Sequence, residues 1–433
     1  MNPLALLPEL LILAGAVAGL VTGLFVARER QRLAAWVNGA ALVAAAVAST
    51  SDGYAADAVT GVARLTVTLT TLLVLCLLAG QARAHPRESE LYTLTSLAAL
   101  GTILMAGATD LLVLVAAYLL ASIPAYALAG FAKDAAGTEA ALKYYLMGAF
   151  LGVLMLAGVT LAYGLTGTTA YAGARAPAVA AVLLLAGPLF KAGCVPAHFW
   201  VPDVAEGTPR AVAAFVTTVP KVGAFAALYR LASSEVLDEP ALLAVVAAAT
   251  MTLGNLAAFH QSQVRRLLAY STISQAGYLL VPVAVAGRTE LAGPALLFYL
   301  AAYAITNLGA FAVVVAVGAD SLRDYAGLAR RSPWTAFALV VCLLGLVGTP
   351  PTAVFAGKVL MFAAAWDGGY GWLAVVAAVN TVASVFYYLR WIRPVFALEG
   401  APGEARGVGV VAVVAAGGSV MLGVGAGVVL LGW

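Results

Sequence analysis

Apolar runs long enough to cross a lipid bilayer follow one another along almost the whole chain, and this pattern limits the fold more than any other feature. Of the 433 residues, 63% are hydrophobic and only 10% are charged, and the mean hydropathy is +0.99. A helix of about 20 apolar residues spans the hydrocarbon core and satisfies its own backbone hydrogen bonds. The sequence therefore predicts an all-α polytopic membrane protein. Little remains for a soluble domain, so we do not expect this chain alone to bind nucleotides or nucleic acids.

Charged residues, glycines and prolines divide the apolar runs into about fourteen predicted spans. The first run has no basic segment before it and is followed by Arg28, Arg30 and Arg32, as expected of a retained helix rather than a cleaved signal peptide. The predicted spans are residues 4–27, 33–50, 61–80, 91–108, 110–131, 138–164, 176–197, 210–233, 240–259, 265–286, 293–317, 333–365, 369–396 and 407–431.

The basic residues between the spans concentrate in alternate turns, and such residues favour the cytoplasmic side of a membrane. This rule places both chain termini outside, with only Arg64, Arg175, Arg230 and Arg288 in outside turns. Once the turns and the helix ends beside them are counted, four basic residues remain without a turn to occupy. They are Lys143, Lys191, Lys221 and Lys358.

Neither the net charge nor the cysteines indicate a bound cofactor. The formal charge of +3, from 23 Lys+Arg against 20 Asp+Glu, is too small to indicate a nucleic-acid partner. Cys76, Cys194 and Cys342 lie far apart in apolar runs, without the spacing of a metal or cluster site. We therefore expect no redox centre, metal site or cofactor in this chain.

Lys221 is the most informative of the four lysines because it lies near the middle of its span. Arg210 is 11 residues before it and Arg230 is 9 after it, which puts Lys221 roughly 14 to 16 Å from either end of the helix. A charge at this depth is costly, and removal from water disfavours the charged form of a lysine. Lys221 is thus predicted to carry protons. The alternative is an inert lysine bound to a backbone carbonyl.

Two further lysines lie beside prolines that break their spans. Lys191 lies between Pro188 and Pro196, and Lys358 follows Pro350 and Pro351. Broken helices at membrane depth are tolerated where they line protein or water, and they occur at transport sites. We therefore predict that both lysines carry protons as well; the alternative is that a carbonyl or water holds each as an inert ammonium.

Polar residues near span ends complete the candidate proton path. Glu139 precedes Lys143 by four residues, the favourable spacing for an ion pair. This pair could be functional, or it could be an ordinary helix-start pair with Thr138 as the cap. His198 follows Pro196 and could shuttle protons between Lys191 and solvent, or it could be an interfacial histidine.

The spacing of the broken spans suggests an internal repeat. Residues 91–233 and 240–396 each hold five predicted spans with the broken span fourth. An odd number of spans makes two copies opposite in membrane orientation, as in many transporters. We therefore predict two inverted five-helix repeats, preceded by three helices in residues 1–90 and followed by one helix in residues 407–433.

Several segments resemble the antiporter-like subunits of proton-pumping NADH:quinone oxidoreductase, respiratory complex I. The longest is LFKAGCVPAHFWVPDVAEGTPRAVAAFVTTVPKVGAF from Leu189, whose form VPDVAEGTP is similar to the N branch of this family rather than the L and M branches. TEAALKYYLMGAF from Thr138, GNLAAFHQSQVRRLLAYSTISQAGYLL from Gly254, GLVGTPPTAVFAGK ending at Lys358 and NTVASVFYYLRWIRPVF from Asn380 also match. Together they cover spans six to thirteen.

The resemblance implies a membrane-arm subunit in a bacterial cell membrane that moves protons while partner subunits bind NADH, FMN, iron–sulfur clusters and quinone. It implies that Lys191, Lys221 and Lys358 are the lysines of spans seven, eight and twelve, and that Glu139 and Lys143 are the span-six pair. One position departs from the family pattern. Where the family has a glutamate in span five, DLLVLVAAYLLASIPAYAL has Leu119, so the usual carboxylate partner of Lys191 is missing.

Two other functions stay open at this point. The same module could belong to a cation/proton antiporter or a membrane-bound hydrogenase, although the EGTP segment favours the quinone-reducing complex. Alternatively, the loss of the carboxylate at Leu119 could mark a scaffold subunit that no longer conducts protons, unless Glu139 replaces it as the partner of Lys191.

Overall fold

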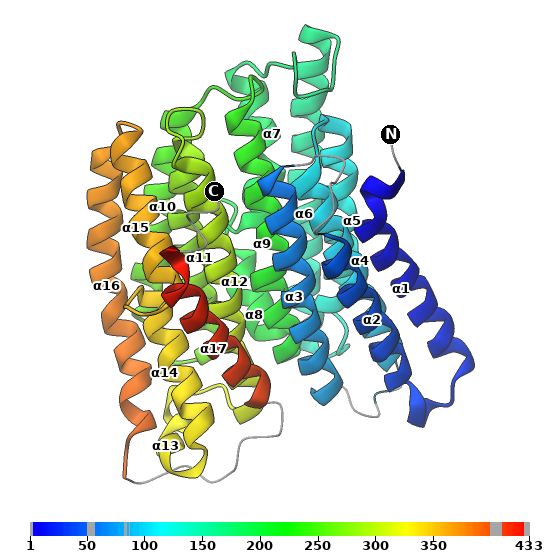
Figure 1. The fold of residues 1–433 in the computed structure, drawn as a ribbon, viewed down its shortest axis with the longest axis vertical. Helices are drawn as coiled ribbons and strands as arrows, with labels where there is room; N and C mark the ends of the chain where they lie inside the picture. Colours follow the sequence, from blue (N-terminus) through cyan, green and yellow to red (C-terminus); the bar gives the residue numbers. More distant parts are fainter. Residues whose placement is uncertain (1–2, 50–56, 82–84, 86, 399–408, 428–433) are drawn as a thin grey trace. The chain divides into compact units, whose positions relative to one another are not determined.

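The fold was determined as a computed structural model that describes residues 3–49, 57–81, 85, 87–398 and 409–427. This part of the chain is α-helical, with only two isolated β-bridges, Asp110–Ala170 and Gln263–Ser321 (Figure 1). Within these described ranges, eleven helices are long and apolar enough to cross a membrane, and three shorter helices are also apolar. The prediction of an all-α polytopic membrane protein is confirmed. The chain divides into two compact units.

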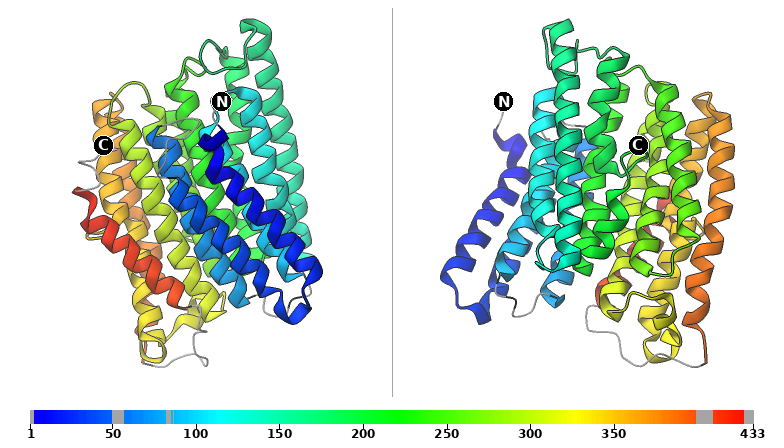
Figure 2. Two further views of the ribbon diagram at one scale, coloured as in Figure 1. Left: turned by 45° about the vertical axis from the view of Figure 1, so that its right-hand side comes forward. Right: turned by 180° about the vertical axis from the view of Figure 1, so that it is seen from behind.

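The first unit comprises residues 1–192 and 207–239. In it α4 packs against α1, α3, α5 and α9, and Figure 2 shows these long helices running side by side. Gly101 of α4 permits the contact with α5, because a Cβ there would collide with the backbone of Ala121. The helices are α1 (Leu7–Phe25), α2 (Arg32–Ala48), α3 (Ala58–Gln81), α4 (Glu88–Gly107), α5 (Leu111–Ala129), α6 (Ala135–Thr166), α7 (Ala178–Ala192) and α9 (Arg210–Ser233), with 3-10 turns η1 (Pro3–Leu6) and η2 (Arg28–Arg30).

The second unit comprises residues 193–206 and 240–433. Its closest helix pair is α10 and α11, where Gly254 and Gly277 each face the backbone of the other helix and leave no room for a Cβ. Its elements are α8 (Trp200–Gly207), α10 (Pro240–Ala258), α11 (Val264–Ala284), α12 (Ala292–Val317), η3 (Leu322–Tyr325), α13 (Leu328–Arg331), α14 (Pro333–Val347), α15 (Ala353–Asp367), α16 (Gly371–Val395) and α17 (Gly409–Val424).

Both predicted helix breaks occur where the sequence placed them. Helix α7 ends at Ala192, inside predicted span seven, and the short helix α8 follows that span, while span twelve separates into α14 and α15. Glycines with positive φ follow the first half of each broken span, Gly193 at 74° and Gly348 at 91°. A left-handed residue just past a helix end is the usual position for glycine. Each break therefore leaves the last carbonyls of a half-helix inside the protein.

The start of span six differs from the prediction. The sequence suggested Thr138 as the helix cap, but α6 begins at Ala135 and its cap is Asp134. The Asp134 carboxylate accepts a hydrogen bond of 2.7 Å from the backbone N–H of Gly137. A carboxylate also favours the positive end of the helix dipole, so the helix starts one turn earlier. The part of span fourteen beyond Gly427 lies outside the described residues, as does Arg406.

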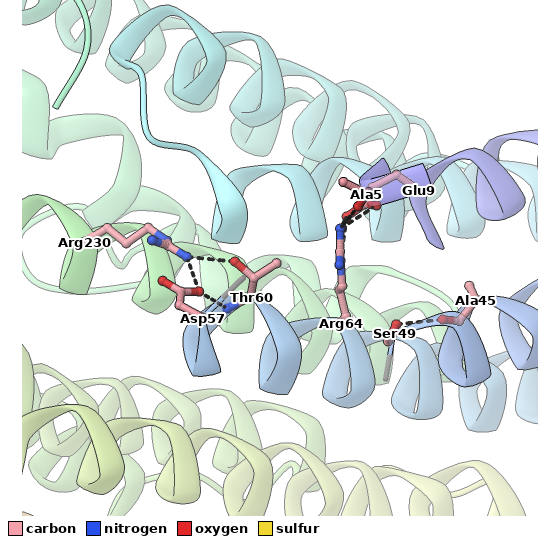
Figure 3. Close-up of polar contacts among 8 residues, drawn as sticks. All are labelled: Ala5, Glu9, Ala45, Ser49, Asp57, Thr60, Arg64 and Arg230. Carbon is pink, nitrogen blue, oxygen red and sulfur yellow. Dashed lines mark hydrogen bonds and ion pairs between the residues drawn. The ribbon is translucent and has the colours of Figure 1, made fainter. Parts of the chain in front are cut away.

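Arg64 was placed in an outside turn, and this prediction is wrong. It is the seventh residue of α3 and is 1% exposed. Its Nε and Nη2 donate to the two carboxylate oxygens of Glu9 at 2.8 and 2.9 Å, and Nη2 also donates to Ala5 O at 2.9 Å (Figure 3). The bidentate carboxylate and the carbonyl accept hydrogen bonds from the guanidinium. The charged side chain can therefore be buried, and it links α3 to α1.

Arg230 forms a second ionic link at the end of α9. Its Nη2 donates to Asp57 and to the hydroxyl of Thr60, both at 2.7 Å, as Figure 3 shows. Its Nε donates to Ala106 O, also at 2.7 Å. This arginine thereby joins the end of α9 to the start of α3 and the end of α4.

Removing only one partner of the Glu9–Arg64 pair should destabilise the protein. Glu9→Leu leaves a buried guanidinium without its carboxylate, a loss of about 3–5 kcal/mol, whereas the double change Glu9→Leu with Arg64→Leu should be much milder. The thermal unfolding midpoint of the purified assembly measures both effects. A double variant as unstable as Glu9→Leu would contradict a role for the pair that depends on charge.

Candidate functional site

Three of the four lysines singled out from the sequence are buried inside helices. Lys191 and Lys221 are 0% exposed and Lys358 is 2% exposed. Each of the three donates a hydrogen bond to a backbone carbonyl. An isolated ammonium in an apolar interior is costly, so its surroundings decide whether it is held charged or released as a neutral amine.

Lys191 lies at the end of α7, and its Nζ is held by groups of α5 and α6. It donates to Ala121 O at 2.9 Å, to Ser122 Oγ at 3.0 Å and to Tyr144 OH at 3.3 Å. Pro124 lies inside α5, where it removes one backbone donor and distorts the preceding turn. Ala121, whose carbonyl accepts from Lys191, lies three residues before this proline.

The ligands of Lys191 are neutral. Among the described residues, no carboxylate pairs with it. The Leu119 side chain is 45% exposed, and the hydroxyl of Ser122 contacts the lysine one turn further along α5. The rings of Tyr126 and Tyr144 lie 6.0 and 5.5 Å from Nζ, near enough for the rings to attract the cation weakly. Hydroxyls, a carbonyl and aromatic rings therefore surround Lys191.

Lys221 reaches the end of the broken helix. From the middle of α9 its Nζ donates to the carbonyl of Ala192, the last residue of α7. The final carbonyls of a helix lack intrahelical partners and carry the negative end of the dipole, so they favour a cation. Ala192 directly follows Lys191, so the end of α7 carries one of the lysines and supplies the carbonyl that the other binds.

Lys358 has the corresponding arrangement in the second unit. It lies in α15, and its Nζ donates at 2.9 Å to the carbonyl of Val347, the last residue of α14. It also donates to Thr381 Oγ1 of α16 at 3.2 Å. The centre of the Tyr278 ring lies 4.2 Å from Nζ. Among the described residues, this lysine also has no carboxylate partner.

Glu139 and Lys143 form the predicted ion pair, but at the protein surface. Their side chains are 66% and 45% exposed and lie 2.7 Å apart within α6. The hydrogen bonds recorded for Lys191 go to other groups, so Glu139 does not contact it directly. The geometry fits an ordinary helix-start pair at least as well as a proton-carrying one.

His198 lies in the segment between α7 and α8 and has intermediate exposure. Its ring meets that of Phe199 at a centroid distance of 6.5 Å. Among the described residues, its Nδ1 has no hydrogen-bond partner. An imidazole nitrogen that is not engaged can exchange a proton, so the shuttle role stays a prediction.

Sequence reasoning missed a set of buried amides near Lys358. Gln275 donates to the carbonyl of Leu346 at 2.8 Å, one residue before the carbonyl that Lys358 binds. Asn255 donates to Asn380 Oδ1 at 2.9 Å and accepts from Tyr387 at 2.9 Å. Their positions inside apolar runs were a usable signal, because a buried amide needs specific partners.

The described residues contain no group of three or more His, Cys, Asp or Glu that could hold a metal ion. The contacts that the structure shows for the three buried lysines are with hydroxyls, carbonyls and aromatic rings. A buried amine beside acceptors can take up and release a proton.

Comparison with known proteins places the chain among membrane subunits. The family described as "NADH:quinone oxidoreductase/Mrp antiporter, TM" matches residues 108–384. NADH-quinone oxidoreductase subunit N of Mycobacterium sp. (strain JLS) is 50% identical, with 99% of this chain and 97% of the relative covered. Subunit N 1 of Streptomyces griseus subsp. griseus has the same identity and coverage.

Solved structures agree with these relatives. A chain of respiratory complex I from Thermus thermophilus with bound aureothin has a TM-score of 0.87 and 34% identity, over 98% of both chains. A chain of the Mrp complex from Dietzia sp. DQ12-45-1b also has a TM-score of 0.87, but its 23% identity shows only a shared fold. The chain therefore belongs to the antiporter-like membrane-subunit family of NADH-quinone oxidoreductase, in the branch of the subunits N.

Proposed function

We propose that this chain is a proton-translocating membrane-arm subunit of NADH-quinone oxidoreductase in a bacterial cell membrane. Protons move on Lys191, Lys221 and Lys358, and both chain termini lie outside. NADH, FMN, iron–sulfur clusters and quinone bind in partner subunits, so this chain contributes to the enzyme as a translocase and contains no redox centre. Other membrane-arm subunits are its neighbours in the assembly.

The observation that carries this proposal is the burial of the three lysines beside acceptors. Where this chain buries an arginine for structure, as at Arg64, it supplies a carboxylate. Lys191 and Lys358 have hydroxyls and carbonyls instead. Neutral ligands leave the energies of the charged and neutral amine closer together than a carboxylate would. This balance suits a group that must take up and release a proton.

The retained lysines argue against a scaffold that has lost transport. A scaffold gains nothing from two buried amines that lack carboxylates, because each costs free energy when it is charged. The loss of the carboxylate at position 119 is compatible with conduction, since Ser122, Tyr144 and Ala121 O supply the contacts of Lys191. The 50% identity to subunits N favours the quinone-reducing complex over an antiporter or a hydrogenase.

Removing the amine of Lys221 should abolish most proton translocation while the complex still assembles. Lys221→Gln deletes the protonation site but keeps a donor for Ala192 O, and we expect a loss of about tenfold or more. Lys221→Arg should fail as well, because a guanidinium hardly deprotonates. Proton uptake into inverted membrane vesicles, divided by NADH oxidised, measures the effect.

Thr217→Val is the matched control for Lys221, since it removes a hydroxyl one turn earlier on α9 that donates to Ala213 O. Its proton-to-electron ratio should stay normal. A normal ratio in assembled Lys221→Gln, or an equal loss in Thr217→Val, would rule out a specific carrier role for Lys221.

The hydroxyl of Thr381 should position Lys358. Thr381→Val removes one of the two hydrogen-bond acceptors of this ammonium, and we expect translocation to fall severalfold because a bond to a charged group is lost. Thr381→Ser keeps the hydroxyl and should retain most of the rate. The same vesicle assay compares them, and equal rates in Val and Ser variants would show that the hydroxyl does not act on Lys358.

A further inference from the structure

A pocket of about 550 Å³ lies in the second unit, remote in sequence from the three buried lysines. It forms where the turn between α10 and α11, the η3 segment and the end of α16 meet. The helix ends around the pocket belong to the alternate turns in which basic residues concentrate. Its lining residues are His260, Gln261, Ser262, Ser321, Leu322, Arg323, Arg390 and Pro394.

Backbone hydrogen bonds fix the walls of this pocket. The N–H of Val264 donates to Asp320 O at 2.7 Å, and that of Leu322 donates to Ser262 O at 3.1 Å. Arg390 donates to the carbonyls of Phe259 and Gln261 across the same turn. The three elements therefore form a connected frame, which holds the pocket open between them.

The pocket is basic. Arg323, Arg390 and His260 line it, and among the described residues the lining includes no acidic side chain. The carboxylate of Asp320, next to this segment, pairs with Arg265 at 2.7 Å, and that of Asp324 accepts from Ser321 N at 3.2 Å. Arginine presents several N–H donors in a fork that matches phosphate oxygens. The charge and the donors of the lining thus suit a phosphate group.

Exposed apolar faces lead from the membrane interior to this pocket on two neighbouring helices. On α16 the side chains of Val375, Val379, Val382 and Phe386 are 58–64% exposed, and their spacing puts them on one helix face. Phe386 lies four residues before Arg390. On α10, Leu256 is 60% exposed and lies four residues before His260.

We propose that this pocket binds the phosphate headgroup of an anionic phospholipid, whose acyl chains lie along the exposed faces of α10 and α16. A basic pocket at the end of membrane helices is a known form of lipid-headgroup site. The apolar faces favour a lipid over free phosphate, because free phosphate would make no use of them. This proposal is independent of proton transfer by the lysines, since it concerns binding alone.

Photo-crosslinking in the assembled complex tests the site. The complex is placed in phosphatidylcholine nanodiscs that contain phosphatidylglycerol with a photoreactive acyl chain, illuminated, digested and mapped by mass spectrometry. We expect labels in residues 253–263 and 379–394, and far fewer labels when phosphatidylcholine carries the same reactive chain. Arg323→Gln should lower phosphatidylglycerol labelling roughly fivefold. Arg28→Gln, an exposed arginine of η2, is the matched control and should leave labelling unchanged.

A measurement on the unaltered complex tests the site even if the Arg323→Gln complex fails to assemble. Raising the salt concentration should weaken labelling by phosphatidylglycerol but not by phosphatidylcholine, since salt screens charge. Equal labelling by the two lipids, no effect of salt, or no loss in assembled Arg323→Gln would overturn the proposal. Displacement of the lipid by millimolar inorganic phosphate would show a free-phosphate site instead. Cross-links from these residues to another subunit would show that protein covers this face.

Discussion

The absence of water in the membrane interior is the constraint on which this structure depends. A helix that ends at membrane depth leaves carbonyls without partners, and lipid cannot satisfy them. This chain ends two helices in this way, at Ala192 and at Val347, and binds the last carbonyl of each with a buried lysine. At each break a lysine therefore supplies a hydrogen-bond donor to a carbonyl that has no partner within its helix.

The same arrangement recurs at the candidate carriers. Lys221 binds the carbonyl of Ala192, the residue that follows Lys191 in the chain. In the second unit Lys358 combines a helix-end carbonyl with the hydroxyl of Thr381. Carboxylates pair with arginines elsewhere in the chain, Glu9 with Arg64 and Asp57 with Arg230. The buried arginine Arg64 thus has a carboxylate partner, whereas Lys191 and Lys358 have hydroxyls and carbonyls as theirs.

The sequence predicted more of the fold than of the site. Apolar runs located the spans, and prolines located both breaks, because these signals are local. The three buried lysines were found by exclusion, since no turn could hold them. Their ligands were not predictable, because Ser122, Tyr144 and Thr381 come from other helices. Arg64 was misplaced for the same reason, since its partner lies 55 residues away. The inverted relation of the two five-helix repeats stays a prediction.

By itself the sequence determined that the chain is helical and membrane-embedded, where its helices break, and that lysines must lie at membrane depth. These properties follow from hydropathy, proline and charge, which act over one or two helical turns. Only the tertiary structure decided that Glu139 does not contact Lys191, that neutral groups surround Lys191, and that a half-helix end meets Lys221. Contacts between helices decide these outcomes, because a buried charge adopts whichever partners packing brings within hydrogen-bonding distance.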